Sequence, residues 1–154
     1  MRYIALILML IAPSWAWGAS SNIPDTNATL EKIGPVRVRV LDQAEGGCWT
    51  NIGEAQIYAL DQLALIGIKS EITTEVSFSG QGSNFLIKVQ GFRNSLGSCV
   101  GAIEVRTDAL VEGQAGIWGV IMYSFHESLH TEPKNLNISV LNSIKKAIKD
   151  WGDQ

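Results

Sequence analysis

Three residues in the last third of the chain have the types and spacing of a metal site. His126, Glu127 and His130 form the pattern H-E-x-x-H within His126-Glu127-Ser128-Leu129-His130. On an α-helix, side chains four residues apart lie on one face, so both imidazoles could bind the same Zn²⁺ ion. The glutamate could then polarise a water molecule bound to the metal. The pattern uses both histidines of the chain.

This pattern resembles the active-site signature of the zincin metallopeptidases. The resemblance covers five residues and implies a zinc peptidase with His126 and His130 as ligands and Glu127 as general base. A zinc site needs a third protein ligand. The chain has no H-x-x-G-x-x-H extension and no glutamate after Glu132. A zinc peptidase, with Zn²⁺ as its cofactor, is therefore an alternative hypothesis and not the first one.

The element that carries the pattern decides whether the histidines share a face. Ile117 to Phe125 is apolar and rich in β-branched and aromatic residues, which favours a strand. Pro133 limits how far a helix could continue. On a strand, the histidines lie near its end and the shared helical face is lost. The sequence leaves open whether residues 117–130 form a strand or a helix.

Aromatic residues supply a second candidate site. Phe92, Trp118 and Tyr123 could form an exposed patch that recognises a partner. The favoured interpretation is that these side chains belong to the hydrophobic core, which is the usual place for large apolar residues. We carry the three residues forward as a candidate interaction surface.

The edge of the expected sheet is a third candidate. Val36 to Val40 or Ile117 to Phe125 forms the free edge, where a partner could pair with the backbone. Arg37 and Arg39 are typical of a protected edge. The open edge is therefore expected at Ile117 to Phe125.

The first eighteen residues predict export. Arg2, the apolar run from Tyr3 to Ala12 and the small-residue site Ala16-Trp17-Gly18 are typical of a secretory signal peptide. A permanent membrane-spanning helix needs about 20 apolar residues, so we expect no transmembrane anchor after cleavage. The mature protein is expected to begin near Ala19 and to be periplasmic or secreted.

The two cysteines, Cys48 and Cys99, are expected to form a disulfide, because an even number of cysteines in an exported chain favours pairing. Closing a loop of this length contributes about 4 kcal/mol in the chain-entropy account. Two separate buried thiols are the alternative. Cys99 shares a strand face with Ile103 and Val105, so the bridge is expected to join a helix to the sheet.

Charge and missing motifs narrow the function. The chain carries 12 basic and 15 acidic residues and no basic run, so a nucleic-acid partner is not expected. It lacks a G-x-S-x-G elbow, a phosphate-binding loop with a following lysine, and a C-x-x-C pair. These absences favour a protein without catalysis and without a cofactor.

Hydrophobic periodicity predicts an α+β fold. Residues 52–66 and the segment from Ile138 to Trp151 have helical spacing, and Asn51 with Glu54 resembles a capping box. The alternating segments are the expected strands: 36–40, 71–78, 85–93 and 99–110. We expect an antiparallel sheet of about 4–5 strands with two helices packed on one face.

The sequence thus predicts three parts: a signal peptide at 1–18, a flexible mature N-terminus at 19–35, and one α+β domain at 36–152. The first functional hypothesis is a small exported binding or accessory protein of the cell envelope or extracellular space. It would contact a protein or small-molecule partner through its sheet. The alternatives are the zinc metallopeptidase and an inhibitor or immunity-type protein.

Overall fold

The computed structural model describes residues 35–73, 83–113, 116–131 and 134–153. The predicted signal peptide and residues 19–34 lie outside the described residues. The elements, in chain order, are β1 (Val36–Ala44), α1 (Ile52–Leu65), β2 (Ser70–Ile72), β3 (Ser83–Arg93), β4 (Cys99–Gly113), β5 (Gly116–Thr131) and α2 (Asn137–Gly152). In the described part of the chain, neither helix has the length and apolar character needed to cross a bilayer.

The α+β class is confirmed, but the sheet is mixed and not antiparallel as predicted. Its strand order is β2-β1-β3-β4-β5. β1 runs parallel to β2 and to β3, whereas β3, β4 and β5 are successively antiparallel. The reason is α1, which carries the chain from the end of β1 back to the start of β2. A helical crossover of this kind makes two strands parallel.

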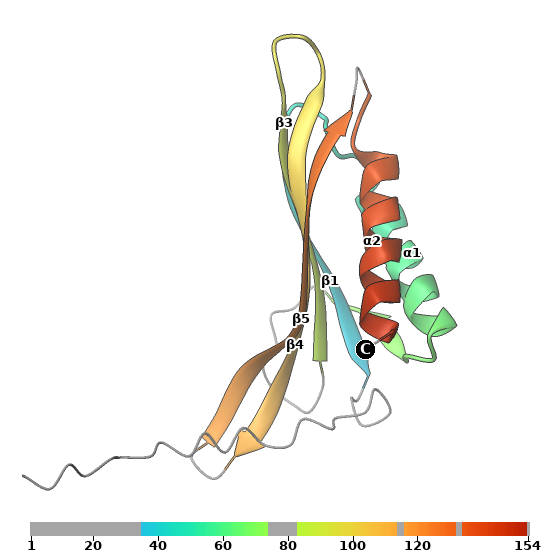
Figure 1. Cartoon of the computed structure of the whole chain (residues 1–154), viewed down its shortest axis with the longest axis vertical. Helices are drawn as coiled ribbons and strands as arrows, with labels where there is room; N and C mark the ends of the chain where they lie inside the picture. Colours follow the sequence, from blue (N-terminus) through green and yellow to red (C-terminus); the bar gives the residue numbers. More distant parts are fainter. Residues whose placement is uncertain (1–34, 74–82, 114–115, 132–133, 154) are drawn as a thin grey trace, which may run out of the picture.

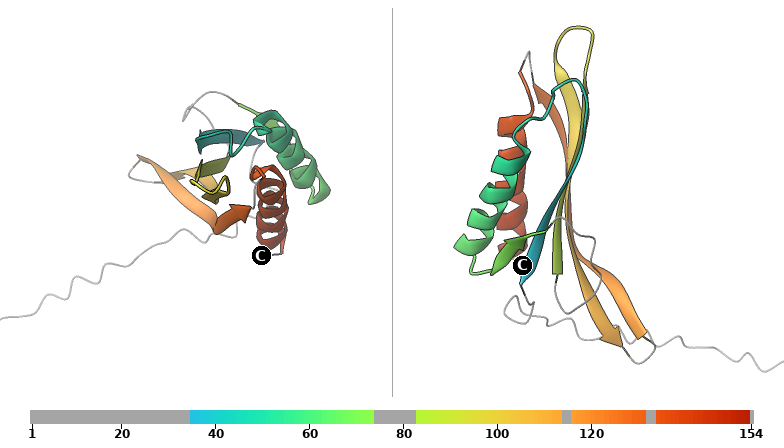
Figure 2. Two further views of the ribbon diagram at one scale, coloured as in Figure 1. Left: turned by 90° about the horizontal axis from the view of Figure 1, so that it is seen from above. Right: turned by 180° about the vertical axis from the view of Figure 1, so that it is seen from behind.

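Both helices lie on the same side of the sheet in the views of Figures 1 and 2. We call the side that faces the helices the inner face and the opposite side the outer face. Successive side chains along each strand point alternately to the inner and to the outer face. In β1, Val36 and Val38 are fully buried, whereas Arg37 and Arg39 alternate with them and lie on the outer face.

The core lies between the inner face and the two helices. On α2, the buried positions recur at helical spacing and form one stripe. Trp151, in the last turn of α2, stacks against Phe85 of β3 and Tyr123 of β5, with ring centroids 6.1 and 6.4 Å apart. Each described strand from β3 to β5 therefore contributes inner-face residues to a core that α2 covers.

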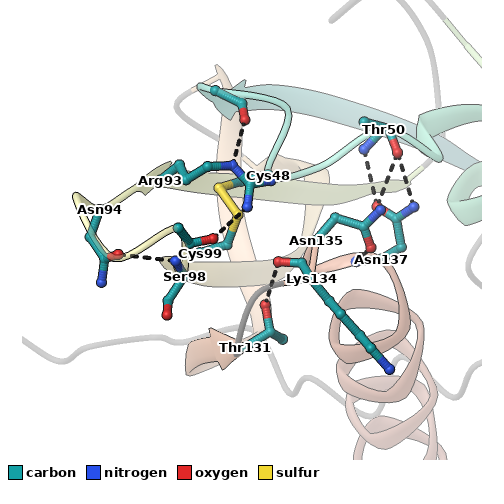
Figure 3. The surroundings of a disulfide bond; sticks show 12 residues. Cys48, Thr50, Arg93, Asn94, Ser98, Cys99, Thr131, Lys134, Asn135 and Asn137 are labelled. Carbon is teal, nitrogen blue, oxygen red and sulfur yellow. Dashed lines mark hydrogen bonds between the residues drawn. A yellow bond between two sulfur atoms is a disulfide. The ribbon is translucent and has the colours of Figure 1, made fainter.

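The predicted disulfide between Cys48 and Cys99 is confirmed, with a Cα–Cα distance of 5.5 Å. It does not join a helix to the sheet, because Cys48 lies in the loop before α1 and the helix begins only at Ile52. The bridge links this loop to the first residue of β4. Figure 3 shows Arg93 beside the disulfide. The guanidinium of Arg93 donates to the carbonyl oxygens of Gly46 (3.1 Å) and Gly97 (2.6 Å). One end of the sheet is thus held by a covalent and a polar link.

Asn51 does not cap α1 as its spacing to Glu54 predicts. Its side chain makes no capping hydrogen bond to the helix backbone. The amide nitrogen donates to Glu54 Oε2 at 2.8 Å, and the amide oxygen accepts from the indole of Trp49 at 2.9 Å. The buried indole therefore takes the acceptor that a helix cap would use.

The hairpin of β4 and β5 extends beyond the rest of the sheet. Pairing of β3 with β4 begins at Ser83 and Ala109, whereas pairing of β4 with β5 continues to Gly113 and Gly116. Figure 1 shows this hairpin projecting past the ends of β1 and β3. β5 is consequently the longest element at an edge of the sheet.

Candidate functional site

The H-E-x-x-H pattern lies on a strand. His126 and His130 are exposed on the outer face of β5, and Glu127 lies on the inner face. Four residues of strand separate the two histidine Cα atoms by about 13 Å, whereas one zinc ion binds nitrogen at about 2 Å. Among the described residues, no three histidine, cysteine or acidic side chains gather closely enough to hold a metal ion. The arrangement that a zincin site requires is therefore not formed.

Glu127 instead joins β5 to α2. Its Oε2 accepts a 2.6 Å hydrogen bond from Ser143 Oγ, and its Oε1 lies 3.6 Å from Lys146 Nζ. Lys146 Nζ also lies 5.2 Å from the ring centre of Phe125. The lysine is thus held above β5 by a carboxylate and an aromatic face, with 57% of its side chain still exposed.

A shallow hollow marks the outer face where β3, β4 and β5 lie side by side. Its volume is about 170 Å³, and its lining is mostly polar: Gln90, Ala102, Ile103, Glu104, His126, Glu127 and Ser128. His126 Nε2 lies 2.8 Å from Ser124 Oγ. An activated serine needs a histidine oriented by a third group. In the described residues, no hydrogen bond joins His126 to a carboxylate, so this pair lacks that third group.

The three aromatic residues of the predicted patch do not form one surface. Tyr123 is only 9% exposed and stacks against Trp151, so it belongs to the core, as the favoured interpretation expects, and not to a surface patch. Phe92 is 56% exposed on β3. The side chain of Trp118 lies outside the described residues.

The free edge predicted at Ile117 to Phe125 is present among the described strands, where β5 pairs with β4 and with no other strand. At the other expected edge, Val36 to Val40, β2 pairs only with Val36, Arg37 and Val38, and no described strand pairs with the rest of β1 on that side. β2 has three residues, and such short edge strands offer little backbone to a partner. Arg37 protects no edge of its own, and its Nε lies 3.6 Å from Glu71 of β2.

The register shows which residues of β5 direct backbone groups outward. Glu45 N donates to Gly91 O at 2.8 Å, so the backbone of Gly91 faces β1 and makes no bond to its β4 partner, Gly101. Gly101 therefore bonds to its partner in β5, Leu129. Because bonded and non-bonded pairs alternate in an antiparallel ladder, every second residue of β5 directs its N–H and C=O to the free edge: Ser124, His126, Ser128 and His130.

In its described part, this edge carries only one of the usual devices against pairing, the inward-pointing charge of Glu127. Natural edge strands carry lysine, proline or inward-pointing charges that prevent another strand from adding. From Tyr123 to Thr131, β5 contains no lysine, arginine or proline. Its one charged residue, Glu127, is already bonded to α2. Nine residues of regular strand are therefore available for backbone pairing.

Known proteins resemble this chain only distantly. No protein-family profile and no curated protein match it in sequence. Among solved structures, a PelC dodecamer from Paraburkholderia phytofirmans is similar, with 12% identity, coverage of 75% of this chain and 83% of that chain, and a TM-score of 0.45. A crystal structure of an uncharacterized protein has 14% identity, coverage of 77% and 86%, and a TM-score of 0.32. The function must therefore be sought in this chain's own residues.

Sequence patterns did not identify Ser124 and Lys146 as site residues. A signal for Ser124 was present, since residues two apart on a strand share a face and Ser124 lies two residues before His126. Lys146 could not be placed, because its position over Phe125 depends on how α2 packs across β5. Sequence patterns give the exposed side of a helix but not its neighbour.

Proposed function

We propose that this protein is an exported, non-catalytic binding module that accepts an extended segment of a partner protein along the free edge of β5. The segment would add a sixth strand to the sheet. This mode of recognition draws affinity from backbone hydrogen bonds and selectivity from alternate side chains. The observation that carries the proposal is the outward backbone of Ser124, His126, Ser128 and His130 on a strand whose described part holds no lysine, arginine or proline.

The disulfide and the leader support the exported part of the proposal. A structural disulfide persists in oxidising compartments and is rare in the cytosol. The bridge between Cys48 and Cys99 lies at one end of the sheet, where β4 begins and β5 ends. The disulfide therefore holds in place the end of the sheet at which a partner strand would pair with β5.

The energetics favour binding by strand addition only if several bonds form together. Each backbone hydrogen bond contributes a net of about 0.5–1.5 kcal/mol. Four outward residues offer four donors and four acceptors in line. Their side chains lie on the outer face, so a partner strand would meet polar groups on that side.

The test is a selection of random dodecapeptides against the purified, oxidised protein. Selected peptides are then measured against Ser128→Pro and, as matched control, Ser128→Ala. Proline removes the outward N–H but breaks no bond to β4, and edge strands tolerate it. We expect Ser128→Pro to weaken binding by at least about tenfold, and Ser128→Ala to bind as the wild type does.

A second measurement keeps the test independent of how well the proline variant folds. Hydrogen exchange on the unmutated protein reports whether the amides of His126 and Ser128 become protected when a selected peptide binds. Peptides that bind Ser128→Pro as tightly as the wild type, or that leave these amides unprotected, would show that the edge of β5 is not the binding site.

A further inference from the structure

The flank of α2 that overhangs the free edge indicates which partner segment fits there. Lys146 Nζ is held over β5 by Glu127 and Phe125 but remains more than half exposed. A strand added to β5 would pass beside this ammonium group on the inner side of the sheet. Lys149 is exposed one turn further along the same helix. Lys146 therefore places an exposed ammonium group on the helix side of the edge, beside Glu127.

Little negative charge on the described edge opposes an acidic segment. Glu127 is the only carboxylate on the described part of β5, and it already accepts from Ser143 and pairs with Lys146. The side chains on the outer side are serines and histidines. The exception is Asp150 of α2, whose negative charge raises the pKa of Tyr123 on β5. Acidic residues are thus favoured beside Phe125 and Glu127, not beside Tyr123.

A second copy of this chain fits the edge less well. Antiparallel pairing of two β5 strands about a twofold axis places both α2 helices on the same side of the new junction. Each helix brings its Lys146, which lies over β5, toward that side. Like charges in such a position repel. Charge complementarity therefore favours a different protein with an acidic strand.

We propose that the occupant of the β5 edge is an extended segment of another protein with acidic residues at alternate positions on its helix-facing side, recognised by Lys146. This inference rests on the strand-addition function and specifies its partner. A carboxylate on the added strand would share the Lys146 ammonium with Glu127. Such charge-assisted bonds are shorter and about twice as strong as neutral ones.

The experiment compares the acidic content of the selected dodecapeptides and their dependence on one lysine. Lys146→Gln removes the charge above β5. Lys145→Gln is the matched control, because Lys145 is also an exposed lysine of the same helix and no contact with β5 is found for it in the described residues. We expect aspartate and glutamate to be enriched at alternate positions. We expect binding to weaken by about fivefold to tenfold in Lys146→Gln and to stay unchanged in Lys145→Gln.

The outcomes separate this inference from the function on which it rests. Peptides that require the outward amide of Ser128 but show no acidic enrichment, or that bind Lys146→Gln as tightly as the wild type, would overturn the acidic partner alone. Peptides indifferent to Ser128→Pro would overturn strand addition itself. A dimer of the purified protein that Ser128→Pro dissociates would identify a second copy as the occupant and would also contradict the inference.

Discussion

The hydroxyl of Ser143 donates a 2.6 Å hydrogen bond to the carboxylate of Glu127. In this contact, the glutamate of the H-E-x-x-H pattern faces α2. His126 and His130 lie on the opposite face of the same strand. On a helix, this pattern would indicate zinc chemistry. On this strand, the carboxylate faces α2 and the two imidazoles are exposed on the other side. The functional interest of β5 consequently shifts from its side chains to its free backbone edge.

Zinc binding is the first property that this geometry predicts. Two histidines whose Cα atoms lie about 13 Å apart along a strand do not form the helical pair of ligands that a zincin site uses. We expect elemental analysis of the purified protein to find no zinc that depends on His126, so the wild type and His126→Ala should give the same value. One zinc per chain in the wild type, lost from His126→Ala, would contradict this prediction.

The Ser143–Glu127 contact should contribute measurably to stability. Ser143 is buried, and its substitution by alanine leaves Glu127 with one bond fewer. Hydrogen bonds to charged groups contribute about 1.5–3 kcal/mol, so Ser143→Ala should lower the free energy of unfolding in urea by about that amount. Asn142→Ala, on the exposed side of the same helix, should change it by less than about 0.5 kcal/mol. Equal effects of the two substitutions would argue against the contact.

The disulfide should stabilise the fold by constraining the unfolded chain. It closes a loop with a sequence separation of 51 residues. Replacing both Cys48 and Cys99 by serine should reduce the free energy of unfolding by about 2–5 kcal/mol. Urea titrations with and without dithiothreitol provide the measurement. The double variant should be insensitive to the reductant, and a wild type equally insensitive to it would contradict a stabilising bridge.

The phenol of Tyr123 should make stability depend on alkaline pH. Burial raises the pKa of Tyr123 above its ordinary value of 10.0, and the nearby carboxylate of Asp150 raises it further. The folded protein thus holds this proton more tightly than the unfolded chain. The corresponding stability is fully present below about pH 10 and is lost as the pH rises through the higher pKa of the folded state.

The Tyr123→Phe variant isolates this contribution because it keeps the ring beside Trp151. Its free energy of unfolding should fall less steeply than that of the wild type between about pH 10 and pH 12. Urea titrations at several pH values measure both slopes. Parallel slopes would show that the phenol does not titrate differently in the two states.

Local patterns predicted the helices and most strands well. The spacing of Ala55, Ala59 and Leu63 places the inner stripe of α1, and the alternation of Phe85, Ile87 and Val89 places the inner face of β3. The sheet was predicted as antiparallel because hairpins are visible in sequence and crossovers are not. The pairing of β1 with β3 joins residues far apart in the chain, so no local signal reports it.

The candidate site was predictable only in outline. The apolar, β-branched character of Ile117 to Phe125 favoured a strand, and β5 confirms it. The open edge was expected there from Arg37 and Arg39 on the other strand, and β5 is the last strand of the described sheet. Which amides point outward depends on the register of β3, β4 and β5 together. The place of Lys146 depends on the packing of α2. Both are properties of the assembled sheet and not of any one segment.

Residue-resolved hydrogen exchange along β5 tests the central claim most directly. In the free protein, we predict that the amides of Ser124, His126, Ser128 and His130 exchange at least about tenfold faster than those of Phe125, Glu127 and Leu129, which bond to β4. Addition of a selected acidic peptide should slow the first set and leave the second unchanged. Equal protection of both sets in the free monomer, or an unchanged first set in the complex, would contradict a free edge that accepts a partner strand.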